Sequence, residues 1–187
     1  KEVERVNLAI QEAQKGKTVC IISSGDPGVY GMAGLVLEII AKENIPLSVE
    51  IVPGIPAANA AAAALGAPLM HDYAVISLSD LLTTWETIEK RIQCAAAADF
   101  VIVLYNPKSS QREWQIEKTV QIILRHKSPA TPVGIVKDAS REGETVVITT
   151  LDKVVTHPID MTTIIIVGNS TTFTYRDFMI TKRGYSV

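Results

Sequence analysis

Apolar residues recur at helical spacing along much of the chain. Near the start, Val3, Val6, Ile10 and Ala13 follow one another at steps of 3, 4 and 3, which places them on one face of a helix. Gly16 follows at the position where helices commonly end. Similar stripes, or alanine-rich composition, predict further helices over 31–43, 56–65, the stretch containing Trp85, Ile88, Ile92 and Ala95, and 111–126.

Short apolar runs between these helices predict strands. They cover residues 17–22, 48–52, 73–78, 100–105, 132–137, 145–149, 163–167 and 178–181. Strands that alternate with helices are typical of an α/β fold with parallel pairing. We therefore expect a mostly parallel N-terminal sheet and a mixed C-terminal sheet, in which 132–137 and 145–149 form a hairpin around the polar turn 138–144. We place the domain boundary near residue 72, giving domains 1–72 and 73–187.

Composition narrows the class of protein. The 187 residues are 47% hydrophobic and 20% charged, an ordinary balance for a globular protein. A formal charge of -2 disfavours a broad nucleic-acid surface, and no apolar run approaches the roughly 20 residues of a membrane helix. Only two cysteines occur, Cys20 and Cys94, which we interpret as buried thiols in a reducing compartment. The histidines and cysteines do not have the spacing of a metal site. We recognise no signal peptide and expect a cytoplasmic protein.

The stretch SSGDPGVYGMAG, residues 23–34, directly follows the first predicted strand. It places Gly25, Gly28, Gly31 and Gly34 at steps of three, with Asp26 inside. Because glycine loses more conformational entropy than other residues, such a cluster indicates a tight bend or a close approach to the backbone. Asp26 suits an amine-bearing ligand, or it forms a local turn or cap with its own backbone. Both interpretations remain open at this point.

Four predicted strands end in small or polar residues, namely in the segments SSGDPG, PGIPA, YNPKSS and GNSTT. In open α/β sheets, ligands bind beyond the carboxyl ends of the strands, so we expect these loops to share one site. The chain has no GxxxxGK[ST] phosphate loop. It also lacks a GxGxxG fingerprint, which disfavours a nucleotide-dependent oxidoreductase, although Glu50 lies near the spacing of a ribose-binding acid.

Six ordered segments resemble the tetrapyrrole methylases, the S-adenosylmethionine-dependent methyltransferases of corrin and sirohaem synthesis. They are SSGDPGVYGMAGLVLEI, VPGIPAANAAAAALGAPLMHD, SLSDLLTTWETIEKRI, ADFVIVLYNPKSSQREWQ, TPVGIVKDASREGE and IIIVGNSTTF with MITKRGY. The segments DLLTTW, YNPKS and MITKRGY are most similar to the branch that methylates precorrin-3B or cobalt-factor III at carbon 17. Family members begin with a GxGPG strand and a helix that this chain lacks, so we expect its first domain to be truncated.

The resemblance implies a two-domain α/β fold, S-adenosylmethionine as cofactor with S-adenosylhomocysteine as product, a tetrapyrrole substrate and a homodimer. It places the cofactor in the cleft between the domains. The residues implied in cofactor binding are Gly25, Asp26, Gly28, Val29, Tyr30, Ile55, Pro56, Ala57, Tyr105, Asn106, Pro107, Gly134, Ile135, Gly168, Asn169 and Ser170.

A carboxylate-bearing corrinoid substrate requires local positive charge, and the candidates are Lys108, Arg112, Lys137, Arg141 and Arg183. We select Lys108, Arg112 and Arg141, of which Lys108 and Arg112 follow the YNP loop. Ring contraction requires proton movement, for which His71 and Asp80 are candidate acid–base groups. Transfer from an activated sulfonium needs no protein nucleophile, so the absence of a catalytic triad is expected. The alternatives are a family member with another substrate, such as diphthine or ribosomal RNA, a nucleotide-dependent oxidoreductase, and a scaffold without activity.

Overall fold

The computed structural model describes residues 1–186. The chain divides into two compact units, Lys1–Ala57 and Ala58–Val187. This division falls after the first residue of the helix α3 (Ala57–Leu65), whereas the sequence places a domain boundary beyond that helix, near residue 72. The helix groups with the second unit because its fully buried Leu65 packs onto Gly134. The boundary near 72 stays a prediction.

The first unit contains two helices, α1 (Glu2–Gln14) and α2 (Ala33–Glu43). Both were predicted from the sequence, and Val6 and Ile10 of the predicted stripe are buried. Helix α2 ends at Glu43 and is capped by Asn44, which adopts a left-handed conformation with φ of 50°. Asparagine tolerates this conformation better than most residues, so it is a suitable helix terminator here.

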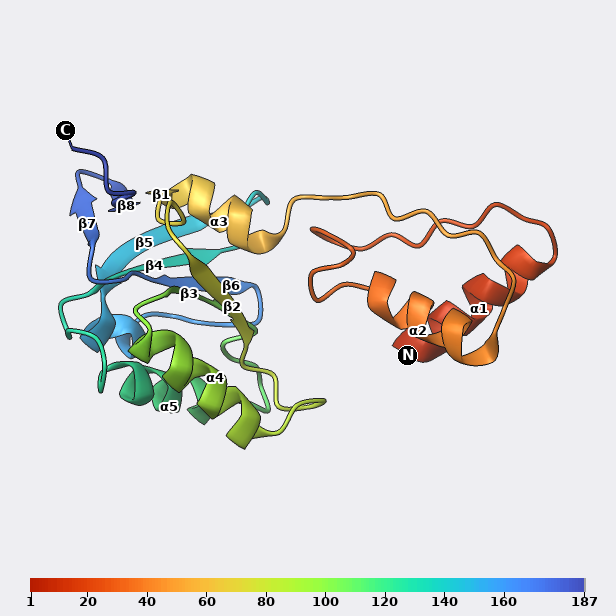
Figure 1. The fold of residues 1–187 in the computed structure, drawn as a ribbon, viewed down its shortest axis with the longest axis horizontal. Coiled ribbons are helices and arrows are strands. Elements are labelled where there is room, and N and C mark those ends of the chain that lie inside the picture. The colour runs from red at the N-terminus through yellow and green to blue at the C-terminus, as the bar shows by residue number, and fades with distance from the viewer. Residues whose placement is uncertain (187) are drawn as a thin grey trace. The chain divides into compact units, whose positions relative to one another are not determined.

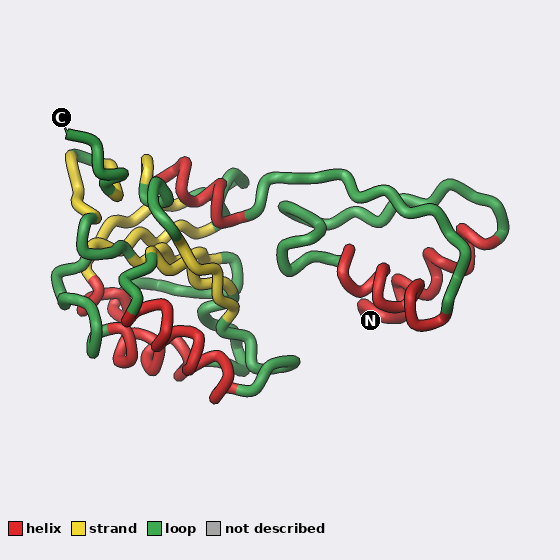
Figure 2. Tube along the Cα trace, in the orientation of Figure 1, coloured by secondary structure: helices red, strands yellow, loops and turns green. Residues whose placement is uncertain are grey.

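The parallel N-terminal sheet expected from the sequence is absent from the part of the chain that the structure describes. Residues 17–22 and 48–52 are extended but form no strand, and Figure 2 shows both as loops. A strand requires a hydrogen-bonded neighbour, and neither segment has one among the described residues. Their apolar side chains are consequently left exposed, including Ile22 at 87% and Val52 at 69%. Cys20 and Cys94, expected to be buried, are also exposed.

The second unit is built on a five-stranded mixed sheet. Its strands are β2 (Tyr73–Ser77), β3 (Val101–Tyr105), β6 (Thr163–Val167), β4 (Pro132–Lys137) and β5 (Thr145–Thr150), in that spatial order. Strands β2 and β3 are parallel, whereas β6 is antiparallel to both β3 and β4. The predicted hairpin is confirmed, since β4 and β5 are antiparallel neighbours.

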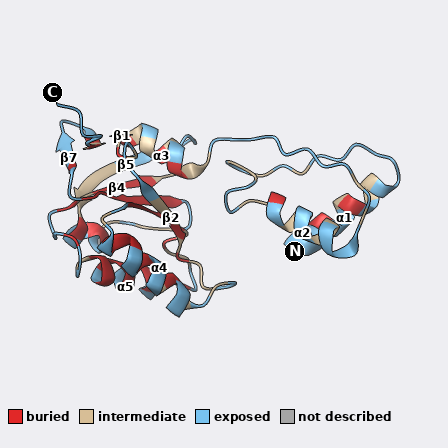
Figure 3. Cartoon of the chain, viewed as in Figure 1, coloured by how far each residue is buried: buried red, intermediate tan, exposed pale blue. Residues whose placement is uncertain are grey.

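Helices cover both faces of this sheet (Figure 1). One face carries α4 (Trp85–Ala97), α5 (Trp114–Ile123) and the 3₁₀ helix η1 (Leu151–Thr156), and the other face carries α3. All five residues of β3 and of β6 are buried, and Figure 3 shows the buried residues concentrated between sheet and helices. These continuous apolar strands form the core because both of their faces are covered.

A second, smaller sheet has the order β1-β8-β7. Strand β8 (Phe178–Thr181) was predicted, whereas β1 (Gly66–Ala67) and β7 (Thr172–Tyr175) were not. A two-residue strand is too short to show any periodicity, so β1 exists only through its pairing with β8. No helix among residues 1–186 is long and apolar enough to cross a membrane.

Candidate functional site

Three strands of the second unit end at the same edge of the five-stranded sheet. Because β6 is antiparallel to both β3 and β4, those two strands run in the same direction, and β2 runs parallel to β3. We call this end of the sheet, where the strands β2, β3 and β4 terminate, the carboxyl edge. It consists of residues 78–84, 106–113 and 138–144, which follow β2, β3 and β4, and of 157–162, which precede β6. Such edges are where α/β proteins bind ligands.

The substrate-binding candidates Lys108, Arg112 and Arg141 lie at the carboxyl edge, and Lys137 is the last residue of β4. Arg183 does not lie there, since it follows β8 and its Nη1 donates to the carbonyl oxygen of Met70 at 3.4 Å. Lys108 and Arg112 follow β3, and Arg141 lies in the exposed turn after β4. Asp80, one of the two candidate acid–base groups, follows β2. The sequence therefore selected residues that the fold brings to one side of the sheet, although it offered no evidence for the direction of β6.

The YNP loop after β3 is held in a fixed conformation. Asn106 has a left-handed backbone with φ of 51°, and its Nδ2 donates a hydrogen bond to Ser77 Oγ at 2.9 Å. Ser77 Oγ also accepts the backbone N–H of Ser79 at 3.2 Å. The side-chain bond between Asn106 and Ser77 thus joins the ends of β2 and β3 next to their last backbone pair, Ser77 and Tyr105. This bond fixes the position of the YNP loop.

Arg112 lies beneath the same loop and is only 7% exposed. Its backbone pairs with Ser109 in an isolated antiparallel bridge, which folds the side chain back toward Asn106. Its Nη1 donates to the carbonyl oxygen of Asn106 at 3.4 Å, and its Nη2 lies 3.1 Å from Met161 Sδ. Neither acceptor is a carboxylate, and Arg112 makes no ion pair with any described residue.

Asp80 and Gln115 connect the loop after β2 to helix α5. Gln115 is 2% exposed, and its Nε2 donates a hydrogen bond to Asp80 Oδ2 at 3.0 Å. Its Oε1 is buried without a hydrogen-bond partner in the described chain. Nearby in sequence, the rings of Trp85 and Trp114 meet edge to face with centroids 4.8 Å apart, joining the first turns of α4 and α5.

A salt bridge closes the carboxyl edge on the side of β4. Lys137 Nζ lies 2.7 Å from Asp160 Oδ2. This contact is the main reason why the pKa of Asp160 falls to about 2, while the same contact raises the pKa of Lys137. The other oxygen, Oδ1, accepts the N–H and hydroxyl of Thr162, so the carboxylate also orders the turn before β6.

We expect Asp160→Asn to lower the thermal unfolding midpoint at neutral pH, because Asn keeps an oxygen for Thr162 but loses the charge facing Lys137. The folded-state pKa of Asp160 lies below its ordinary 3.8, so its contribution is present above that value and is lost as the pH falls toward about 2. The difference in unfolding midpoint between wild type and variant should therefore disappear as the pH falls from 3.8 to about 2. Thermal unfolding between neutral and acid pH measures it, with the exposed Asp177→Asn as control. A difference that persists at pH 2 would contradict the assignment.

Two cofactor-binding candidates, Tyr105 and Gly134, lie on the sheet face that α3 covers. Tyr105 Oη accepts the backbone N–H of Ala58 at 2.8 Å, in the first turn of α3. Gly134 is buried, and a Cβ at this position would overlap the side chain of Leu65. The absence of a side chain at Gly134 is therefore explained by helix packing. Its neighbour Ile135 points to the opposite face and belongs to the core beneath α4 and α5.

Gly168, Asn169 and Ser170 lie at the opposite edge of the sheet from Tyr105–Pro107. Strands β3 and β6 are antiparallel, with Ile102 opposite Val167 and Leu104 opposite Ile165. The loop after β6 therefore lies beside the beginning of β3, and the length of the strand separates it from the YNP loop. The expectation that all the glycine- and proline-containing loops lie on one side is wrong for this pair. We call this second side the amino edge.

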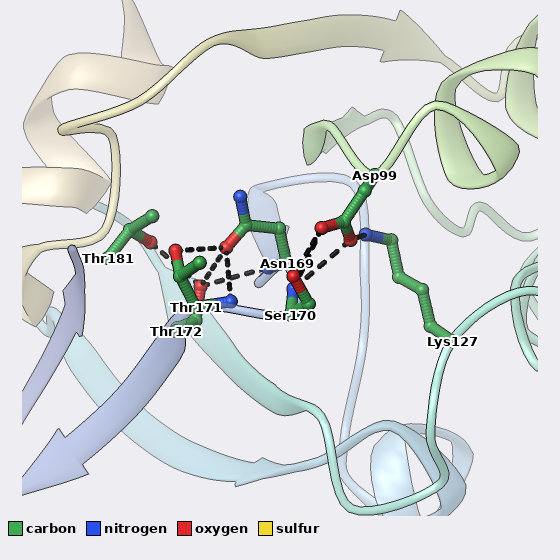
Figure 4. A network of polar contacts seen from close by, with 7 residues as sticks. All are labelled: Asp99, Lys127, Asn169, Ser170, Thr171, Thr172 and Thr181. Carbon is green, nitrogen blue, oxygen red and sulfur yellow. Dashed lines mark hydrogen bonds and ion pairs between the residues drawn. The ribbon is translucent and has the colours of Figure 1, made fainter. Parts of the chain in front are cut away.

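Figure 4 shows what Asn169 and Ser170 do at the amino edge. Ser170 donates its N–H and its hydroxyl to the carboxylate of Asp99, which also accepts Lys127 Nζ at 3.0 Å. Asn169 Oδ1 accepts the N–H and hydroxyl of Thr171. The Lys127 side chain is 2% exposed, so Asp99 compensates its buried charge. Ser170 thus links the loop after β6 to Asp99 before β3 and to Lys127 after α5, whereas Asn169 orders its own loop.

The other acid–base candidate, His71, is also placed at the amino edge. It precedes β2, whereas Asp80 follows it, so the five residues of β2 lie between them. At roughly 3.3 Å per residue the strand alone spans about 16 Å, too far for both groups to act on one atom. His71 Nδ1 accepts the N–H of Asp72 at 2.9 Å, a local turn contact. The structure therefore does not bring these two candidates together.

In the first unit, Asp26 joins the glycine loop to the PGIP loop. Its Oδ1 accepts the N–H of Gly28 at 2.8 Å, and its Oδ2 accepts the N–H of Gly54 at 3.0 Å. These backbone bonds, that from Gly54 foremost, lower the pKa of Asp26. Of the two interpretations left open by the sequence, the structure favours the turn-forming one, because both oxygens are already occupied by backbone donors.

The two loops approach so closely that only glycine fits at the contact. A Cβ at Gly54 would overlap the carbonyl oxygen of Gly25, and Gly25 itself has a φ of 73°. Beyond this contact the loops expose Val29, Tyr30 and Ile55, and the half-buried Pro56 and Ala57 continue into α3. The loops therefore present peptide groups and apolar side chains to solvent, while the Asp26 carboxylate is engaged by the two backbone N–H groups.

Sequence reasoning missed several residues that organise these sites. Ser77, Gln115, Asp160 and Lys127 each hold a loop or a buried charge through a partner distant in sequence. One signal was available for Gln115, a polar residue next to Ile116 on the apolar stripe of α5. The others look like ordinary surface residues in the sequence, because their partners are known only after folding.

Comparison with known proteins agrees with this fold. A family model described as Tetrapyrrole (Corrin/Porphyrin) Methylases matches residues 1–155. A cobalt-factor III methyltransferase of Priestia megaterium is 54% identical over 188 residues, and a "Probable cobalt-factor III C(17)-methyltransferase" of Salmonella typhimurium is 51% identical over 187 residues. The crystal structure of the methyltransferase CobJ superposes with a TM-score of 0.92 at 34% identity, over 97% of this chain and 77% of that one.

The relatives differ in how much of their length corresponds to this chain. The match covers 98% of this chain but 35% of the Priestia protein, and 100% of this chain but 78% of the Salmonella protein. The similarity thus extends over the whole of the present sequence, while each relative contains further residues.

Proposed function

Because the chain belongs to the tetrapyrrole methylase family, we propose that it takes part in methyl transfer from S-adenosylmethionine to carbon 17 of a precorrin-3B-type tetrapyrrole. The reaction is accompanied by ring contraction and belongs to cobalamin biosynthesis. The observation that carries this proposal is the 51% identity, over every residue of the chain, to a protein named as a cobalt-factor III C(17)-methyltransferase. The names of both relatives favour a cobalt-bearing substrate.

The cofactor supplies a methyl group that is already activated on a sulfonium, so the protein has to bind, orient and keep water away. We assign the methionine and ribose end to the loop of Gly25, Asp26, Gly28, Val29 and Tyr30, together with Ile55, Pro56 and Ala57. Asp26 acts there by holding the two loops together, since its oxygens accept backbone N–H groups. The exposed peptide groups beside it are the direct contacts.

In the second unit, Tyr105, Asn106, Pro107, Gly134 and Ile135 stay candidates for cofactor binding. Tyr105 to Pro107 are the best supported, because they lie at the carboxyl edge in a loop held by Ser77. Gly168, Asn169 and Ser170 receive no such support, since they lie at the amino edge and are engaged in the Asp99 network.

Asp80 is the acid–base candidate that we retain for ring contraction. It lies at the carboxyl edge with the substrate-binding candidates, and Gln115 holds one of its oxygens. His71 is less well supported because it lies at the other end of β2. A homodimer and a cytoplasmic location stay predictions.

Calorimetric titration tests the proposal most directly. We expect S-adenosylmethionine and S-adenosylhomocysteine to bind and NAD to release no heat, and we expect mass spectrometry to detect one added methyl group on cobalt-factor III. The titration should also use a chain extended to the length of the Salmonella relative. Binding of NAD instead would favour the oxidoreductase alternative, which no comparison supports. Cofactor binding with methylation of a different acceptor would favour another family activity.

A further inference from the structure

We propose that a polar cavity at the amino edge of the second unit binds a small neutral molecule with adjacent hydroxyl groups, such as a sugar ring. The cavity has a volume of about 340 Å³ and lies where the turn after α5, the first residue of β4 and the loop after β6 meet. The methyl transfer proposed above makes no use of this cavity, so the site is independent of that function.

The cavity has the size and the fixed walls of a ligand site. Its volume lies at the lower end of the range of about 300–1,000 Å³ that is usual for ligand pockets, and it is roughly ten times the volume that one water occupies in the liquid. Its polar wall is held in place, because the carboxylate of Asp99 accepts both Lys127 Nζ and the N–H of Ser170.

Three side chains of this wall are more than nine-tenths buried and have hydrogen-bonding capacity left. They are Asn169, Lys127 and Thr131, which are 6%, 7% and 8% exposed. Asn169 Oδ1 accepts the N–H and hydroxyl of Thr171, but its Nδ2 donates to no residue among 1–186, and Figure 4 shows this nitrogen without a dashed line.

The other two side chains are also incompletely satisfied within the described chain. An ammonium has three N–H donors, and the acceptor that Lys127 has is Asp99, at 3.0 Å. The hydroxyl of Thr131 has no hydrogen-bond partner among residues 1–186. Buried polar groups are nearly always paired in folded proteins, so three such groups around one cavity indicate a site that a ligand completes.

The charges around the cavity select a neutral ligand. Asp99 already compensates Lys127, and its side chain is 44% exposed, so its carboxylate would repel an anion. Lys127 would in turn repel a cation. An apolar molecule would leave the donors of Lys127 and Asn169 without acceptors, at a cost in free energy.

Hydroxyl groups match the donors and acceptors of this wall, because a hydroxyl both accepts and donates. One hydroxyl can accept from Lys127 or Asn169 and donate to Asp99. Since Lys127 Nζ and Asp99 Oδ1 lie only 3.0 Å apart, two hydroxyls on neighbouring carbons reach both groups at once. A sugar ring carries such pairs in a fixed arrangement.

Saturation-transfer NMR on the full chain tests the proposal, with D-ribose as the probe. We expect D-ribose to bind in the millimolar range, since a ligand of this size forms few contacts. Tetrahydrofurfuryl alcohol, a similar ring with a single hydroxyl, should bind at least about tenfold more weakly, and so should the anion D-ribonate. S-adenosylhomocysteine should not displace D-ribose, because the cofactor contacts are assigned elsewhere.

Thr131→Val is the most conservative variant, because it keeps the shape of the side chain and removes a hydroxyl that no described residue uses. It should weaken D-ribose binding at least about threefold, as expected for loss of one hydrogen bond. The matched control is Thr174→Val, at an exposed position of β7 outside the cavity, which should change binding less than about twofold.

A second variant blocks the cavity and leaves its polar groups in place. Ala130 is exposed and lines the cavity, so Ala130→Leu should abolish D-ribose binding without disturbing the core. Ala41→Leu, on the exposed side of α2, is its control and should bind D-ribose like the wild type. Absence of D-ribose binding to the wild type, wild-type binding by Thr131→Val or Ala130→Leu, equal binding of the three probes, or displacement of D-ribose by S-adenosylhomocysteine would each overturn the proposal.

Discussion

Gly134→Ala is expected to lower the free energy of unfolding by about 1–3 kcal/mol, the usual effect of overpacking a tight core. A Cβ at this position would lie 2.9 Å from Leu65 Cγ and would overlap both of its methyl groups. Leu65 is fully buried and has little free space into which to turn. Unfolding monitored through Trp85 and Trp114 measures the effect, since both tryptophans belong to the second unit.

The double variant Gly134→Ala with Leu65→Ala separates overpacking from other causes. Leu65→Ala alone should cost about 2–5 kcal/mol by leaving a cavity beneath α3. In the double variant the new methyl group occupies part of that cavity, so the two losses should sum to more than the measured total. Gly34→Ala, in α2, is the control, because nothing lies within 4 Å of its added Cβ. Strictly additive losses would contradict this account of the α3 contact.

Asp26→Ala is expected to weaken S-adenosylmethionine binding by at least about tenfold, because it removes two charge-assisted bonds. The change leaves the N–H groups of Gly28 and Gly54 without their acceptor and separates two loops that are far apart in sequence. Asp26→Asn should be nearly as damaging, since one of its terminal atoms becomes a donor that faces another donor. Calorimetric titration with the cofactor measures both variants.

The charge of Asp26 also predicts how binding depends on pH. Its pKa in the folded chain is lowered, so its contribution is present above the ordinary value of 3.8 and is lost as the pH falls through the lowered value. Glu43→Gln, an exposed carboxylate at the end of α2, serves as the control and should bind the cofactor like the wild type. Wild-type affinity in Asp26→Ala would show that the loop contact does not organise the cofactor site.

The local elements were determined by the sequence because their signals lie within a few residues of one another. The stripe containing Val6 and Ile10 predicted α1, and the continuous apolar runs predicted β3 and β6. Turn chemistry between 132–137 and 145–149 likewise predicted the β4–β5 hairpin, which the structure confirms. The expected helix 111–126 begins later, at Trp114, because the Ser109–Arg112 bridge precedes it, a contact that helical periodicity does not reveal; its last residues, 124–126, form a turn.

The residues that resemble a known family also identified the protein's class before any coordinates, and the family match over residues 1–155 confirms that identification. Long motifs are specific because many side chains and turns must agree at once. The same motifs indicated which residues bind ligands, but not where each of these residues lies in the fold. Asp26 was correctly chosen as a special residue, but only the fold revealed that its oxygens hold Gly28 and Gly54.

The tertiary structure alone decided which loops share an edge and which charges are compensated. The parallel pairing of β2 with β3 places Lys108, Arg112 and Asp80 at one edge and His71 at the other. The antiparallel direction of β6 adds Ser170 to the edge of His71, and no local pattern encodes the direction in which a buried strand enters a sheet. Residues 17–22 and 48–52 have strand-like sequences but form no strand here, because a strand is a property of a hydrogen-bonded pair. Secondary structure depends largely on residues that are close in sequence. Strand pairing, burial and charge balance depend on residues that only folding brings together.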